Sequence, residues 1–286
     1  NEGFTVYLER RIMEELEGKD YADMISVIGF QDLETSMRNI PEKYTSLKVN
    51  MKDANPDDAF SDVPYDKGYL FLKMLETRYG IEKFDQFLTQ YFSSHAFQTM
   101  TTEKFVDYMK ANLTNGEDDF VQEWIYTTGW PKILVKPTSK LFDLVEAQFD
   151  QDIKNARNNV AAKKVEISSK STNEWVHFIR LIDPKTNTIS DLEHLDKIYG
   201  FTNSKNPEIQ TAWYEKSFLM KYDVVHQNAK EFLVKVGRRK FLEPLYLALK
   251  ESNQIALAHD IYKAARPNYH FVARNTIDGM LNFKAN

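Results

Sequence analysis

Apolar positions recur along this chain with the spacing of α-helices. In residues 4–17, apolar side chains lie three and four residues apart, with Glu and Arg between them. This is the pattern of an amphipathic helix, whose apolar stripe faces a core. The apolar positions of this segment are Phe4, Tyr7, Leu8, Ile12 and Leu16.

The clearest predicted helix covers residues 64–79. Pro64 suits a first helical position, where its missing N–H is not needed, and Gly80 can close the helix. Most of the apolar side chains between them are expected to be buried, namely Tyr69, Leu72, Met74, Leu75 and Tyr79. The same spacing predicts further helices near residues 81–93, 102–113 and 117–126.

Two stretches interrupt this helical pattern. Residues 45–63 contain the sequence Asn-Pro-Asp-Asp and are predicted to form a loop that holds one short extended piece at most. Residues 127–137 combine Gly129 with Pro131 and Pro137, which stop helix formation over about ten residues. The second stretch is therefore predicted to be an interdomain linker.

Helical spacing resumes beyond this break, with short polar turns between the segments. The predicted helices lie near residues 140–160, 172–182, 189–198, 207–217, 220–235, 240–251 and 253–266. Residues 157–170 are ambiguous, because Val160, Val165 and Ile167 would also suit an extended piece. Consecutive antiparallel hairpins of this kind favour an armadillo-like or HEAT-like stack, although no repeat of fixed period is visible.

These patterns predict an all-α protein with two domains. We expect a first domain over residues 1–127, a linker over 128–139 and a helical domain over 140–286. The chain has 286 residues, 42% of them hydrophobic and 13% aromatic, which is enough for one large core or two smaller ones.

Composition excludes several classes of protein and of site. The net charge is −5, so no basic field attracts nucleic acid or membrane, and we expect neither as a partner. Cysteine is absent, which excludes disulfides and thiolate metal sites within the chain. This absence fits a cytoplasmic location, and periplasmic or secreted enzymes can lack cysteine as well. There is no signal peptide and no apolar run of about 20 residues. The sequence starts without methionine, in a segment that already has helical spacing, so we expect a preceding part of the protein to be missing.

The histidines do not form a metal-binding motif. They are His95, His177, His194, His226, His259 and His270. No two of them lie two or four residues apart, so the chain lacks the His-Glu-x-x-His pattern that places two imidazoles on one helix face. Neighbouring residues therefore cannot assemble a His-based zinc site, and each histidine is expected to be a surface or core residue.

The first nine residues change this picture. They read Asn-Glu-Gly-Phe-Thr-Val-Tyr-Leu-Glu, and on composition alone Glu2 and Glu9 are solvated carboxylates near a helix start. The run resembles the Leu-Asn-Glu-Gly-x-x-x-Tyr-x-Glu segment of gluzincin zinc aminopeptidases, peptidase family M1. In that family the glutamate of Asn-Glu-Gly is the third zinc ligand, after the two histidines of the His-Glu-x-x-His helix. The resemblance implies that Glu2 is a zinc ligand and that Glu9 lies beside the metal site.

A second match follows at residues 55–68, which end in Val-Pro-Tyr-Asp-Lys-Gly. This segment is similar to the Val-Pro-Tyr-Glu-Lys-Gly segment of the leukotriene hydrolase-like members of the family. There the tyrosine donates a hydrogen bond to the oxyanion of the tetrahedral intermediate, which implies that role for Tyr65. By the same match, Asp57 and Phe60 line the peptide pocket, and Phe60 replaces a second active-site tyrosine that the lipid reaction uses. Without the resemblance, Tyr65 is one of 15 tyrosines, at a helix start.

The third match is Gly-Arg-Arg-Lys-Phe at residues 237–241. It resembles the family's Gly-Arg-x-Lys-Phe, whose cations hold the C-terminal carboxylate of the substrate, and implies that role for Arg238 and Lys240. A solvated basic patch, or a weak nucleic-acid contact, is the alternative on composition alone. Side chains at i and i+2 of a helix point apart, so for both cations to reach one carboxylate the segment should lie at a helix start or in a turn.

Together the three matches imply the helical lobe of a thermolysin-like catalytic domain followed by an armadillo-like domain. The implied activity is that of a zinc metallo-aminopeptidase, with one zinc ion held by Glu2 and two histidines outside this chain. Short, tripeptide-sized peptides are the implied substrates, and a monomer is expected. Residues 1–286 alone are expected to be inactive. The alternative is a non-enzymatic helical scaffold with a concave face for a protein partner.

Overall fold

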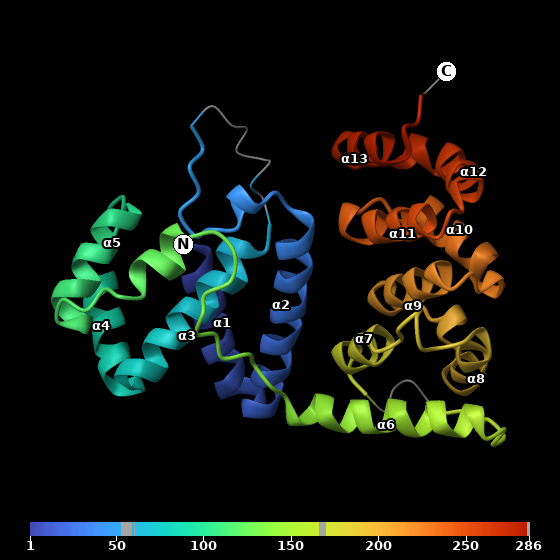
Figure 1. The fold of residues 1–286 in the computed structure, drawn as a ribbon, viewed down its shortest axis with the longest axis horizontal. Coiled ribbons are helices and arrows are strands. Elements are labelled where there is room, and N and C mark those ends of the chain that lie inside the picture. Colours follow the sequence, from blue (N-terminus) through green and yellow to red (C-terminus); the bar gives the residue numbers. More distant parts are fainter. Residues whose placement is uncertain (53–58, 60, 166–169, 285–286) are drawn as a thin grey trace. The chain divides into compact units, whose positions relative to one another are not determined.

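The structure, a computed structural model, describes residues 1–52, 59, 61–165 and 170–284. Within these ranges every regular element is a helix and no strand is present, so the all-α prediction is confirmed. The chain divides into two compact units, Asn1–Lys140 and Leu141–Asn286, which are coloured blue to green and green to red in Figure 1. None of the described helices is both long and apolar enough to cross a membrane.

Unit 1 holds the following elements. They are α1 (Glu2–Glu17), α2 (Lys19–Asn39), the 3-10 turn η1 (Glu42–Tyr44), the π-helical turn η3 (Val63–Lys67), α3 (Gly68–Tyr79), α4 (Ile81–Ser94), α5 (Thr102–Met109) and the π-helical turns η4 (Lys110–Thr114) and η5 (Gln122–Tyr126). Residues 19–39, for which no element was predicted, form α2. The predicted helix at 117–126 is reduced to η5, and the one at 102–113 changes to π-helical geometry after α5.

In helix α1 the apolar pattern predicted only some of the buried positions. Its buried positions are Gly3, Val6 and Tyr7, which pack on α2, η3 and α3. Of the other predicted stripe residues, Phe4 is partly buried, whereas Leu8 at 40%, Ile12 at 56% and Leu16 at 70% are exposed. The periodicity predicts a helix with an apolar side. Which residues on that side are buried depends on the elements that pack against the helix.

Polar contacts fix α1 against the two helices that follow the loop. The Tyr7 hydroxyl donates a hydrogen bond of 2.7 Å to Glu76 on α3 and accepts one of 2.9 Å from Arg11. Arg11 also donates two bonds, of 2.8 and 3.0 Å, to the carboxylate of Asp85 on α4. Burial and the hydrogen bond to Glu76 raise the pKa of the Tyr7 phenol well above its usual range, so the hydroxyl keeps its proton and remains a donor.

A buried lysine closes unit 1 around η3. The side chain of Lys67 is fully buried, and its ammonium donates hydrogen bonds to the backbone oxygens of Thr45 at 2.8 Å, Gly129 at 2.9 Å and Thr127 at 3.4 Å. Burial lowers its pKa to about 8. Three carbonyl acceptors offset the desolvation of the charged form. Residues 127–129, which follow η5, are thus held within unit 1. The linker boundaries at 128 and 139 stay a prediction.

Unit 2 is a stack of antiparallel helices. Its elements are α6 (Lys140–Arg157), α7 (Thr172–Arg180), α8 (Ile189–Tyr199), η7 (Phe201–Asn203), α9 (Pro207–Leu219), η8 (Asp223–Val225), α10 (His226–Lys235), α11 (Arg239–Glu251), α12 (Ile255–Ala265), η9 (Arg266–Asn268) and α13 (Phe271–Leu281). Alternate helices pack on one another, α7 on α9, α9 on α11, α11 on α13 and α10 on α12, so that two layers build the stack in Figure 1. This is the predicted armadillo-like arrangement.

Local signals explain several helix ends of unit 2. Ser171 with Glu174 and Thr188 with Asp191 form capping boxes at the starts of α7 and α8. Helix α8 ends where Gly200 adopts a left-handed conformation with φ of 66°. The ambiguous segment 157–170 forms no strand in its described part.

Candidate active site

The predicted metal ligand stands at the beginning of α1. Glu2 is the first residue of this helix, follows the N-cap residue Asn1 and is partly buried. A carboxylate there is stabilised by the helix dipole and suits zinc as an oxygen ligand. Within the described parts of the chain, no group of three or more His, Asp, Glu or Cys side chains could hold a metal ion. Glu2 suits zinc as one oxygen ligand, and the described residues do not bring together the further ligands that a zinc site needs.

Glu9 lies farther along the same helix, on its solvent side. Its side chain is 56% exposed, and its carboxylate accepts a hydrogen bond of 2.6 Å from Arg10. The Arg10 side chain is largely buried and reaches in the other direction to within 3.8 Å of Asp66. Arg10 therefore links the predicted neighbour of the metal, Glu9, to the turn that carries Tyr65.

Tyr65 occupies the middle of η3, which begins at Val63 and runs into α3 without a break. The sequence predicted an ordinary helix start at Pro64, whereas the first turn is π-helical. Such turns are rare and often found at functional sites, because they re-aim side chains relative to the helix that follows. Tyr65 is partly buried and its ring packs against the core of unit 1. Since α1 packs directly on η3 and α3, Glu2 and Tyr65 lie on neighbouring elements of one compact unit.

Two of the predicted pocket residues cannot be placed. Asp57 and Phe60 lie outside the residues that the structure describes, so their predicted roles stay predictions.

The predicted carboxylate anchors belong to unit 2. Arg238 is the N-cap residue of α11, with φ of −79° and ψ of 120°, and the helix begins at Arg239. The segment therefore lies at a helix start, as two convergent cations require. Both Arg238 and Lys240 are exposed and lie over the ring of Phe241, at 5.9 and 5.5 Å from its centroid. Lys240 also donates a hydrogen bond of 2.8 Å to Glu208 on α9.

Sequence reasoning missed Asp66, which directly follows Tyr65. Its carboxyl is buried against Gly29 of α2, where an added Cβ atom would lie only 2.1 Å from Oδ1. Burial raises the pKa of Asp66 to about 7, against the opposing effect of Arg10, and the carboxylates of Asp62, Asp32 and Glu9 raise it further. No local signal marks this residue, because its burial arises from α2 packing across η3.

Replacing Asp66 by asparagine is expected to stabilise the protein increasingly as pH rises. Between the ordinary pKa of 3.8 and the folded value of about 7, the folded state keeps a proton that the unfolded chain has lost. The free energy of unfolding of the wild type therefore falls with pH across this window and levels off above it. Thermal unfolding of wild type and Asp66→Asn, compared at several pH values, measures the difference. A difference that did not change with pH would contradict the burial of an ionisable Asp66.

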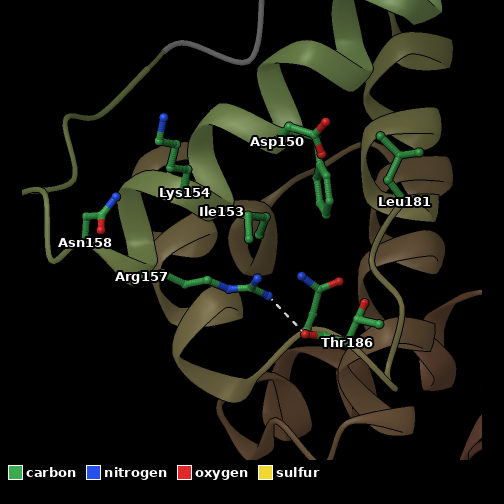
Figure 2. Close-up of a pocket in the computed structure, with 9 residues that line it drawn as sticks. Asp150, Ile153, Lys154, Arg157, Asn158, Leu181 and Thr186 are labelled. Carbon is green, nitrogen blue, oxygen red and sulfur yellow. Dashed lines mark hydrogen bonds between the residues drawn. The ribbon is translucent and has the colours of Figure 1, made fainter.

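Unit 2 also contains a cavity of about 500 Å³ at the end of α6, shown in Figure 2. Arg157 points into it, but its guanidinium already donates to the backbone oxygen of Thr186 at 3.0 Å and to Asp191 at 3.3 Å. The remaining lining is Phe149, Asp150, Ile153, Lys154, Asn158, Leu181 and Asn187. None of the predicted functional residues lines this cavity.

Comparison with known proteins gives a family for each unit. Residues 1–124 match the family described as "Peptidase family M1 domain", and residues 170–281 match "Leukotriene A4 hydrolase, C-terminal". The chain is 32% identical to "Leucine aminopeptidase 2" of Yarrowia lipolytica, over 97% of this chain and 46% of that protein. It is 30% identical to the "Leukotriene A-4 hydrolase homolog" of Botryotinia fuckeliana, over 97% of this chain and 44% of that protein.

Solved structures agree with these relatives. The yeast LTA4 hydrolase in complex with bestatin superposes with a TM-score of 0.86 at 26% identity, over 99% of this chain and 50% of that chain. The native enzyme from Saccharomyces cerevisiae superposes with a TM-score of 0.78 at 27% identity. The chain thus spans about half the length of the relatives it matches, 46% of the first relative and 50% of the first structure.

Proposed function

We propose that the chain, whose residues 1–124 match the M1 peptidase domain, is the part of a zinc aminopeptidase that supplies one metal ligand, the oxyanion donor and the substrate carboxylate anchor. The observation that carries this proposal is the packing of α1, which begins at Glu2, directly on the turn that holds Tyr65. A metal ligand and an oxyanion donor must serve the same carbonyl group, so they need to stand on neighbouring elements.

The chemistry divides among a few side chains. When bound, zinc lowers the pKa of its water and polarises the scissile carbonyl. Glu2, at the N-terminal end of α1, would hold the ion as an oxygen ligand. Tyr65 donates a hydrogen bond to the developing oxyanion, for which a phenol suits well, because it is a neutral donor at pH 7. Glu9, which accepts a hydrogen bond from Arg10, supports α1 beside the metal.

The substrate's far end is held at the start of α11. Arg238 presents a guanidinium fork and Lys240 an ammonium, both of which bind carboxylates. No side chain caps this helix, so its first backbone N–H groups and its dipole also favour an anion there. The similarity of residues 237–241 to the family's carboxylate-binding segment supports short, tripeptide-sized peptides as the substrates.

The proposal predicts different behaviour for residues 1–286 alone and for the full-length protein. The 286-residue polypeptide is expected to bind no zinc tightly and to cleave no peptide, because it contributes Glu2 but no His-Glu-x-x-His motif. The full-length protein is expected to bind one zinc ion and to release N-terminal residues from tripeptides.

Calorimetric zinc titration and a peptidase assay on both proteins test this, with circular dichroism to confirm that each is helical. Removing zinc from the full-length protein with a chelator should abolish cleavage, and added zinc should restore it. Stoichiometric sub-micromolar zinc binding by residues 1–286, or chelator-resistant cleavage by the full-length protein, would show that the assignment is wrong.

A further inference from the structure

Two glycines bring the backbones of α1 and α3 into direct contact. A Cβ atom added to Gly3 would lie 2.7 Å from both the Cα and the carbonyl carbon of Gly68. One added to Gly68 would lie 2.9 Å from the Cα of Gly3 and 3.3 Å from its nitrogen. Real Cβ atoms do not approach backbone atoms this closely, and backbone cannot swing aside as a flexible side chain can. The contact therefore exists only because both residues lack a side chain.

Backbone conformation does not require glycine at these positions. Gly68 has ordinary helical dihedral angles, φ of −62° and ψ of −43°, and Gly3 lies inside the first turn of α1. Alanine is preferred over glycine in a helix by about 1 kcal/mol, so local propensity opposes both glycines. The close approach of the two elements is the physical reason that remains for them.

The contact joins the two residues on which the proposed chemistry depends. Gly3 follows Glu2 directly, and Gly68 lies three residues after Tyr65 on the continuous path from η3 to α3. An added methyl group at either glycine forces the two backbones apart by several tenths of an ångström. This displacement moves Glu2 and Tyr65 relative to each other, because each lies close to one of the glycines along the chain. Misplacement of a catalytic group by about 1 Å can lower a rate by about 10²-fold.

We propose that the Gly3–Gly68 contact sets the spacing between Glu2 and Tyr65, and that the two glycines are positioning residues for catalysis. This inference rests on the proposed function, because it assigns the spacing a meaning only if Glu2 binds zinc and Tyr65 donates to the oxyanion. Gly68 acts mainly on Tyr65, since both belong to one continuous helical path. Gly3 acts mainly on Glu2, its direct neighbour.

The test is a double-mutant cycle in the full-length protein with Gly68→Ala and Tyr65→Phe, alone and combined. Gly68→Ala is expected to lower kcat for tripeptide hydrolysis by about tenfold to a hundredfold, with a smaller change in KM and with zinc retained. In the Tyr65→Phe background the same substitution is expected to change kcat less than about twofold, because the donor that it displaces is already gone. Metal content is measured for every variant.

Gly279→Ala is the matched control. Gly279 lies within α13, and a Cβ atom there meets no heavy atom within 4 Å, so its kcat should equal that of the wild type. If Gly68→Ala does not fold, Gly3→Ala takes its place, because it adds a methyl group to the other side of the same contact. Gly3→Ala is then expected to weaken zinc binding as well as kcat.

The outcomes separate this inference from the proposed function. If Tyr65→Phe lowers kcat but Gly68→Ala does not, the positioning role is wrong and the proposed function stands. Equal losses from Gly68→Ala in both backgrounds would also overturn it, because the glycine would then act on packing rather than through Tyr65. If Tyr65→Phe itself leaves kcat unchanged, both ideas fail together.

Discussion

Replacing Tyr65 by phenylalanine in the full-length protein is expected to lower kcat for peptide hydrolysis by about 10²–10³. Removing one oxyanion donor leaves the developing negative charge without its hydrogen bond in a site where water cannot substitute well. The substitution deletes a single oxygen from a ring that packs on the core of unit 1, so the ring contacts and the fold should survive. Zinc content should be unchanged, because a tyrosine donor to the oxyanion is not a metal ligand.

Steady-state kinetics with a tripeptide and metal analysis of the purified variant measure this effect. Tyr108→Phe on α5 is a matched control, because its ring packs between aromatic neighbours at Phe87, Tyr91 and His95 and its hydroxyl has no proposed role. A loss confined to KM would mean that Tyr65 binds the ground state and the transition state equally. Unchanged kcat and KM would remove Tyr65 from the mechanism.

Helical elements were predicted from the sequence because their signals are local. Pro64 and Gly80 act within one turn of the chain, and the helix they bound was expected at residues 64–79, where η3 and α3 lie. The exposure of Leu8, Ile12 and Leu16 could not be predicted in this way. Their spacing predicts a helix, but their burial depends on which element packs against that helix. The helix's own sequence does not specify that element.

In the candidate site, too, local features were predicted from the sequence, whereas contacts between distant segments were not. Glu2, Tyr65 and Arg238 were predicted as site residues from short motifs, which carry residue types and spacing. The π-helical geometry around Tyr65, the burial of Asp66 against Gly29 and the approach of Gly3 to Gly68 were not. The burial of Asp66 and the approach of Gly3 to Gly68 depend on contacts between residues more than twenty positions apart. Periodicity within single segments holds no information about such contacts.

Arg238→Ala in the full-length protein is expected to lower kcat/KM for tripeptides by about tenfold to a hundredfold. A hydrogen bond to a charged group contributes about 1.5–3 kcal/mol, and each 1.4 kcal/mol is a factor of ten. Arg238 should matter more than Lys240, because the ammonium of Lys240 already binds Glu208 at 2.8 Å, whereas Arg238 makes no ion pair within the described residues. Arg238→Lys should restore part of the loss, since a single ammonium replaces the two-pronged guanidinium.

A tripeptide amide isolates the contribution of the carboxylate. Without its negative charge this substrate should be cleaved slowly by the wild type and at nearly the same rate by Arg238→Ala. Arg239→Ala is the neighbouring control, because Arg239 lies one position farther along the same helix and pairs only loosely with Glu243, at 3.9 Å. If Arg238→Ala lost equal activity towards the acid and the amide, Arg238 would act on the fold of α11. If it lost none, the carboxylate would be held elsewhere, and the preference for tripeptides would need another cause.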